Sequence, residues 1–182
     1  MRTLRAFTLL CLSLYLPIYL SSNSGIGSIG EIKEEPKVTP NSSPKNFSDF
    51  LDDIGMVESS GRYKIINTYG YMGKYQFSKA TLKSIGIKIK PQDFLNNPEL
   101  QEIAMKRLLD ANKNTLRKYI TKYSESTVQG IKISESGILA AAHIAGAGNV
   151  KKFFDNGQDF KDGYGTKLTD YLQKFYGYQL DL

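Results

Sequence analysis

One carboxylate stands in a setting that suits acid–base chemistry. Glu58 follows Ile54 by four positions and Val57 by one, in a stretch where apolar residues recur at helical spacing. Helical geometry therefore places the Glu58 carboxylate on or beside the apolar face, at the end of a helix. Burial there favours the protonated carboxyl group, the form that a general acid needs near neutral pH. Considered alone, Glu58 could equally be a partly exposed glutamate that ends a helix.

The acidic residues near Glu58 do not supply a partner carboxylate. Asp49, Asp52 and Asp53 lie upstream on the same predicted helix, where Asp49 and Asp52 fall mostly on the polar face. We interpret them as solvated charges. Acid–base chemistry at this site would therefore depend on one carboxylate.

Other common chemistries lack the residues they need. The chain has one cysteine, Cys11, and one histidine, His143. These cannot form a zinc site of the usual nitrogen and sulfur ligands, so we expect no metal and no other cofactor. A serine or cysteine triad would have only His143 as base, and no Gly-x-Ser-x-Gly elbow occurs. Acyl-transfer chemistry is disfavoured, and we predict that His143 packs or lines a cleft.

Helices would position Glu58. Apolar residues at helical spacing predict a helix from Asn46 to near Glu58, and Asn97 followed by Pro98 predicts a second that runs toward Tyr119. Shorter helices are predicted near residues 78–85, 136–145, 149–155 and 166–176. Residues 61–77 are dense in Gly, Tyr and Asn and lack helical period, which predicts extended or hairpin structure. The predicted fold class is mainly α (α+β), with a small β-hairpin or irregular element.

The N-terminus reads as a secretory signal peptide, residues 1–22. Arg2 and Arg5 precede an apolar run over residues 6–20, and small polar residues follow at once. The run is shorter than the roughly 20 residues that span a bilayer, and it contains Pro17, so we expect no stable membrane span. The protein would be exported, to the periplasm or outside the cell. A retained membrane anchor and a lipid on Cys11 are the alternatives.

The rest of the chain divides into a flexible linker, residues 23–45, and one domain, residues 46–182. The linker is rich in Ser, Gly, Pro, Glu and Lys. The net formal charge of +6 suits an anionic polymer. Nucleic acid is not the expected partner, because the lysines are scattered and no nucleic-acid motif occurs. A basic nucleic-acid-binding protein remains a minor alternative, and we expect a monomer.

Four short segments carry a more specific pattern. Residues 57–63 read VESSGRY, residues 70–77 read GYMGKYQF, residues 142–150 read AHIAGAGNV and residues 169–171 read TDY. In this order they resemble the motifs of the soluble lytic transglycosylase (SLT) family, which is related to goose-type lysozyme within the lysozyme-like superfamily. The resemblance covers about residues 46–176, and the ordered set is more specific than any one motif.

The resemblance implies a lysozyme-like fold with peptidoglycan glycan strands as substrate. Glu58 falls on the family's catalytic glutamate, Gln76 on a glutamine that faces the substrate cleft, and Tyr171 on a tyrosine close to the catalytic glutamate. Cleavage would occur between N-acetylmuramic acid and N-acetylglucosamine. One carboxylate would serve twice, first as acid and then as base for the muramic C6 hydroxyl, which gives 1,6-anhydro products.

Further candidate contacts are less sharply defined. The resemblance makes Ser59 a neighbour that hydrogen-bonds substrate or the catalytic carboxylate. Tyr75 is a candidate sugar contact because a tyrosine ring can stack on a sugar, and Gly146 either ends a helix or lets the backbone approach a sugar. Two positions depart from the family pattern: His143 replaces a tyrosine, and Ile144 replaces an asparagine that binds substrate.

Two other functions stay open at this point. A lysozyme-like muramidase would hydrolyse the same bond with water and release reducing ends. A non-catalytic cell-wall-binding protein would keep the cleft without the chemistry, and the Ile144 departure makes this conceivable.

Overall fold

The computed structural model describes residues 45–182, which form a mainly helical fold. The predicted signal peptide and nearly all of the predicted linker lie outside these residues. The described elements are α1 (Phe47–Ser59), α2 (Lys79–Ser84), α3 (Pro91–Leu95), α4 (Pro98–Tyr123), β1 (Thr127–Val128), β2 (Ile131–Lys132), α5 (Glu135–Ala145), α6 (Ala147–Asn156) and α7 (Leu168–Lys174). The predicted mainly α class and the six predicted helices are confirmed, whereas α3 was not predicted.

Local signals fix both ends of α1. The Asn46 side chain accepts a hydrogen bond from the backbone N–H of Asp49, and the Asp49 carboxylate accepts one from the N–H of Asn46, which forms a capping box. Phe50 and Ile54 on the inner face are fully buried. Ser60 ends the helix in the left-handed conformation. Glu58 therefore lies in the last turn, where the chain leaves the helix.

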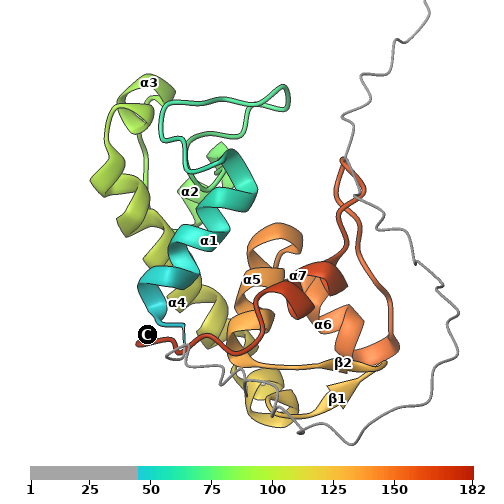
Figure 1. The fold of residues 1–182 in the computed structure, drawn as a ribbon. Coiled ribbons are helices and arrows are strands. Elements are labelled where there is room, and N and C mark those ends of the chain that lie inside the picture. The colour runs from blue at the N-terminus through green and yellow to red at the C-terminus, as the bar shows by residue number, and fades with distance from the viewer. Residues whose placement is uncertain (1–44) are drawn as a thin grey trace, which may run out of the picture. The chain divides into compact units, whose positions relative to one another are not determined.

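The long helix α4 joins the two halves of the described chain. It begins as predicted, with the Asn97 side chain accepting from the N–H of Leu100 and with Pro98 in the first turn. In Figure 1, α4 runs from α3 at one end to the β1–β2 hairpin at the other. Its inner face packs against α3, α5 and α6. One helix thus contributes side chains to both halves.

Helix α5 is the centre of the second half, where it packs against α4, α6 and α7. Its residues from Ser136 to Ala142 are all buried. Small side chains allow close packing, since a Cβ at Gly137 would lie 2.6 Å from the Leu172 carbonyl oxygen of α7. The aromatic rings of Phe50 and Phe175 then join α1 to the end of α7, with ring centroids 5.8 Å apart.

The β structure lies elsewhere than predicted. Residues 61–77 contain isolated bridges, Ile66 to Met72 and Met72 to Phe77, but no strand. The antiparallel strands β1 and β2 instead connect α4 to α5. Within this segment, Gly73 has a positive φ of 76° and meets the Gln101 side chain, which leaves no room for a Cβ. The predicted small β-hairpin or irregular element is therefore an irregular segment with isolated antiparallel bridges.

The C-terminal residues return to the start of α1. The N–H of Gln179 donates to the carbonyl of Lys45 over 2.9 Å, and the Tyr178 hydroxyl donates to Asp53 over 2.6 Å. This closes the described chain around one continuous core. Within residues 45–182, none of the helices combines the length and apolar character that crossing a membrane requires.

Candidate active site

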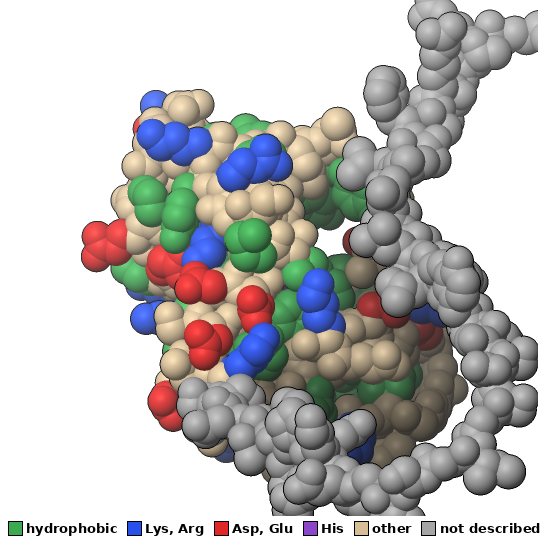
Figure 2. All heavy atoms as spheres, in the orientation of Figure 1, with side chains coloured by type: hydrophobic (Ala, Val, Ile, Leu, Met, Phe, Trp, Pro, Cys, Tyr) green, Lys and Arg blue, Asp and Glu red, His purple; other side chains and the backbone are tan. Residues whose placement is uncertain are grey.

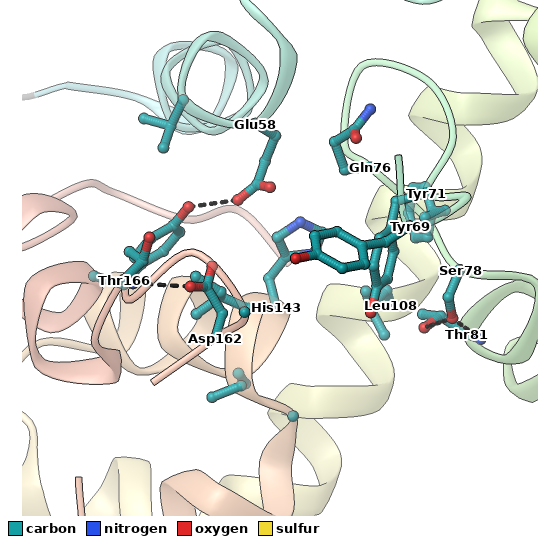
Figure 3. A pocket seen from close by; sticks show the side chains of 18 of the residues that line it. Glu58, Tyr69, Tyr71, Gln76, Ser78, Thr81, Leu108, His143, Asp162 and Thr166 are labelled. Atoms are coloured by element: carbon teal, nitrogen blue, oxygen red, sulfur yellow. Dashed lines mark hydrogen bonds between the residues drawn. The ribbon is translucent and has the colours of Figure 1, made fainter. Parts of the chain in front are cut away.

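A cleft of about 740 Å³ lies where α1, the irregular segment, α2, α4, α5 and the segment before α7 meet. Glu58 and Tyr171 line it, and Ser78 and Thr81 lie across it, with His143 and Leu108 between (Figure 3). The lining mixes carboxylate, hydroxyl and amide groups with apolar and aromatic ones, and contains no lysine or arginine. Such a cleft suits a neutral, polar ligand with apolar faces.

Glu58 and Tyr171 form the most directed pair in the cleft. The Tyr171 hydroxyl donates to Glu58 Oε1 over 2.5 Å, although the residues are 113 positions apart. Burial, followed by the nearby Glu58 charge, raises the pKa of Tyr171 well above its usual value, so this hydroxyl keeps its proton. The bond fixes the Glu58 side chain, whose other oxygen is turned toward the cleft (Figure 3). Glu58 is half-buried and reachable by a ligand.

His143 lines the cleft from α5, in keeping with the role predicted for it. Burial lowers its pKa, while the Glu58 charge and the Tyr75 backbone act in the opposite direction. The ring packs edge-on against Phe77, with centroids 6.1 Å apart. His143 is therefore neutral at pH 7 and lies opposite the Glu58 side chain (Figure 3).

Gln76 and Gly146 also line the cleft, as does Ile144. Gln76 adopts a positive φ of 51°, and its side-chain Nε2 donates to the Gly73 carbonyl over 2.9 Å. Gly146 joins α5 to α6 with a φ of 77°, in open space where a Cβ would meet nothing within 4 Å. The Gly146 conformation, rather than crowding, therefore favours glycine. Ile144 adds an apolar side chain to the lining.

Two expected substrate contacts face away from the cleft. The Ser59 hydroxyl is buried, donates to the Lys74 carbonyl over 2.8 Å and accepts from the Arg62 N–H over 2.9 Å. The ring of Tyr75 is fully buried, and its hydroxyl donates to Glu102 over 2.6 Å. Both lie outside the cleft lining, so the geometry corrects their expected role. Their side chains hold the irregular segment on α1 and α4.

A buried ionic cluster supports the cleft wall from behind. Lys74, only 6% exposed, pairs with Asp52 over 2.9 Å and with Glu102 over 3.1 Å. Burial by itself lowers the pKa of Lys74, but the two carboxylates more than offset this and raise it. The Tyr63 and Tyr75 hydroxyls donate to the two oxygens of Glu102. We call these five residues the Lys74 cluster; its outermost member, Asp52, is solvent-exposed as predicted, with 68% of its side chain accessible, and still pairs with Lys74.

Two loop tips meet at the mouth of the cleft. The rings of Tyr69 and Tyr164 contact edge to face with centroids 5.2 Å apart, and both side chains are largely exposed. The Asn67 side chain accepts from the N–H of Tyr69, and the Asp162 side chain accepts from the N–H of Tyr164, each over 2.9 Å. These Asx turns give both tips a defined shape.

The lining residues that sequence reasoning missed include Asn112, Asp162 and Tyr164. Asp162 Oδ1 accepts hydrogen bonds from the N–H groups of Tyr164 and Thr166 (Figure 3). The other carboxylate oxygen, Oδ2, takes part in neither bond. The sequence signals for these residues were weak. An Asp two residues before a Tyr in a Gly-rich stretch indicates a turn, and Asn112 follows Leu108 by one helical turn, but neither spacing reveals a cleft.

Charge and metal-ligand clustering give no competing site. On the face drawn in Figure 2, basic and acidic side chains intermingle and do not separate by sign. No group of three or more His, Cys, Asp or Glu side chains within residues 45–182 is placed to hold a metal ion. The cleft around Glu58 is therefore the best-supported functional site in this part of the chain.

Comparison of the chain with protein-family models, with curated proteins and with solved structures found no match. The interpretation of the cleft therefore depends on its own geometry and on the motifs in the sequence.

Proposed function

We propose that the protein is a peptidoglycan lytic transglycosylase with a lysozyme-like fold and that Glu58 is its single acid/base. The observation that carries this proposal is the Glu58–Tyr171 pair. Two residues that the motifs single out independently, at opposite ends of the domain, are joined by a 2.5 Å hydrogen bond inside the cleft. A hydrogen bond between residues of two separate motifs is expected if both motifs contribute to one active site.

The proposed reaction needs one carboxyl group. Glu58 gives its proton to the glycosidic oxygen as the bond to C1 of N-acetylmuramic acid breaks, which leaves an oxocarbenium-like centre. The Glu58 carboxylate then takes the proton of the muramic C6 hydroxyl, and that oxygen bonds to C1. The products are a 1,6-anhydromuramic end and a free N-acetylglucosamine 4-hydroxyl, and Glu58 is protonated again. Tyr171 holds the carboxylate in place through both steps.

The hydrolytic alternative has one specific observation in its favour. Asp162 lines the same cleft, so a second carboxylate is available to activate water in a muramidase. Asp162→Asn tests this, because an asparagine oxygen still accepts the two backbone N–H bonds that shape the loop. We expect this variant to keep its activity. Loss of activity with an unchanged melting temperature would favour hydrolysis with Asp162 as base.

The decisive experiment is mass spectrometry of the soluble products of purified peptidoglycan sacculi in water enriched in ¹⁸O. We expect the full chain to release anhydro-muropeptides without ¹⁸O, whereas hydrolysis would place ¹⁸O at reducing ends. Glu58→Gln should lower the rate by about 10²–10⁴-fold, the usual contribution of a general acid. Glu99→Gln, at an exposed position of α4, is the matched control. Binding to sacculi without any product would support the wall-binding alternative.

A further inference from the structure

The 66–72 loop and the 161–167 loop, which meet at the mouth of the cleft, have the same local structure. Each is closed at its base by an isolated antiparallel bridge between its first and last residues. In each loop the second residue, Asn67 or Asp162, accepts hydrogen bonds from the N–H groups of the fourth and sixth residues. The fourth residue is tyrosine in both loops, and the fifth is a glycine with positive φ. The two tyrosines are therefore carried at equivalent positions on loops of the same shape.

The loop tips reach each other from the two halves of the described chain (Figure 1). The rings of Tyr69 and Tyr164 contact edge to face, and the hydroxyl groups of Thr68 and Tyr164 lie 3.4 Å apart. A Cβ at Gly163 would lie 3.6 Å from the Tyr69 hydroxyl oxygen, which is ordinary contact distance. We call the contact among Thr68, Tyr69, Gly163 and Tyr164 the clasp.

The clasp lies on the solvent side of the cleft. Tyr69 and Tyr164 are 61% and 66% exposed, whereas the floor of the cleft is largely buried. The floor comes from α4 and α5 and includes Leu108, Asn112, Ala142 and His143. A linear ligand that lies along the floor would have the clasp on its outer side. It could then leave the cleft sideways only if the two loops separate.

The clasp is a weak contact between two well-formed loops. Within residues 45–182, one hydrogen bond joins the loops, between the Thr68 and Tyr164 hydroxyls, and no ion pair does so. An edge-to-face aromatic pair shifts an equilibrium by only about 2–10-fold. The hydrogen bonds that shape each loop are internal to it, so they persist when the loops separate. The clasp can therefore open without unfolding either loop.

We propose that the clasp opens to admit a glycan strand from the side and then closes over it. The bound strand lies between the clasp and the floor of the cleft. This inference depends on the proposed function, since it takes a glycan strand as the ligand. A strand that enters sideways needs no free end, so the enzyme can act on interior bonds of a cross-linked wall.

A reversible covalent link across the clasp tests the proposal. Thr68→Cys and Gly163→Cys place one thiol on each exposed tip and leave both tyrosines in place. A Cys11→Ser background leaves no other cysteine. A short bifunctional methanethiosulfonate reagent joins the two thiols through disulfides, which a reductant breaks. The link closes a covalent ring of residues 68–163, which contains the floor of the cleft.

The order of linking and binding gives the readout. The protein also carries Glu58→Gln, so that purified sacculi stay intact, and its retention on the sacculi is measured. Linking before mixing should abolish retention, and reductant should restore it. Linking after mixing should trap the protein on the cross-linked network, so that it resists denaturant and is released only by reductant. The matched control is the same protein with each thiol capped by methyl methanethiosulfonate, which should bind in either order and wash off in denaturant.

Two results would overturn the inference. Retention of the protein linked beforehand, equal to that of the capped control, would show that entry does not require the clasp to open. Release in denaturant of the protein linked after binding would show that the strand does not lie inside the ring. Melting curves check that the variant is folded. If Gly163→Cys unfolds the protein, Thr68→Cys with Tyr164→Cys joins the same two tips.

The two proposals can fail separately. If linking traps the protein but the chain with Glu58 releases no products from sacculi, the clasp stands and the proposed catalytic function falls. If sacculi yield products but linking neither blocks binding nor traps the protein, the catalytic proposal stands and the clasp is rejected.

Discussion

The Lys74 cluster and the floor of the cleft both place polar groups out of water, but they do so in opposite ways. In the Lys74 cluster, the ammonium group donates to Asp52 and Glu102, and the Glu102 carboxylate also accepts from the Tyr63 and Tyr75 hydroxyls. In the cleft floor, Asn112 Nδ2 and His143 Nδ1 have no partner among the described residues. Satisfied polar groups hold structure, whereas buried polar atoms without a partner lower stability.

Substitutions in the two regions should therefore affect different properties of the protein. Changes in the Lys74 cluster should lower the free energy of unfolding and affect activity only through the folded fraction. Changes in the cleft should affect catalysis or binding with little loss of stability. The predictions below test that division from the largest expected effect to the smallest.

Lys74→Met should give the largest loss of stability. It keeps the side-chain stem that packs on Gly55 but removes the charge between Asp52 and Glu102. Breaking a buried ion pair from one side costs about 3–5 kcal/mol. Because the Glu102 side chain is 28% exposed and that of Asp52 is 68% exposed, we expect a loss at the lower end, about 3 kcal/mol. Chemical denaturation measures it, with Lys79→Met at an exposed site as control. A near-neutral result would mean that the cluster does not hold the cleft wall.

Tyr171→Phe should lower kcat roughly 10–100-fold and leave KM nearly unchanged, since a hydrogen bond to a charged group contributes about 1.5–3 kcal/mol. The hydroxyl orients Glu58 through its hydrogen bond to Oε1. Steady-state kinetics on sacculi with a parallel melting curve measure both effects. An unchanged kcat would remove Tyr171 from the proposed mechanism. A large drop in melting temperature would show that the hydroxyl stabilises the fold.

Tyr164→Ala should raise KM by about 3–10-fold without changing the melting temperature, because one exposed aromatic contact contributes about 0.5–1.5 kcal/mol. The ring lies at the mouth of the cleft against Tyr69 and is 66% exposed. Tyr176→Ala removes a half-exposed tyrosine outside the cleft lining and is the control. Equal KM values for the two variants would show that the mouth does not contact the glycan.

His143→Gln should make stability less sensitive to acid, by at most about 1.4 kcal/mol per pH unit. Burial lowers the pKa of His143 below the ordinary value near 6.5, so the unfolded chain binds the proton more tightly than the folded one. Stability is therefore lost as pH falls below about 6.5. Melting curves at pH 7.5 and pH 5.5 should show a smaller drop for the variant than for the unchanged protein. Equal drops would contradict a His143 pKa that is lowered by burial.

Much of the fold followed from local patterns. The cap at Asn46, the pair Asn97–Pro98 and the small residues of α5 predicted their helices because these signals act over one or two turns. The β1–β2 hairpin was missed, since two-residue strands leave almost no periodicity to detect. The placement of Ser59 and Tyr75 was also wrong, because their partners, Lys74 and Glu102, lie 15 and 27 positions further along the chain.

The sequence by itself determined which groups exist for chemistry and the order in which they occur: one histidine, Glu58 at a helix end, and the later Gln76, Gly146 and Tyr171. Only the tertiary structure decided which of them share a cleft. It brought Tyr171 to Glu58, turned Ser59 and Tyr75 away, and added Asp162 and Asn112 to the lining. The physical reason is that helical period fixes the face on which a side chain lies. The packing of other segments then decides whether that face meets solvent, core or cleft.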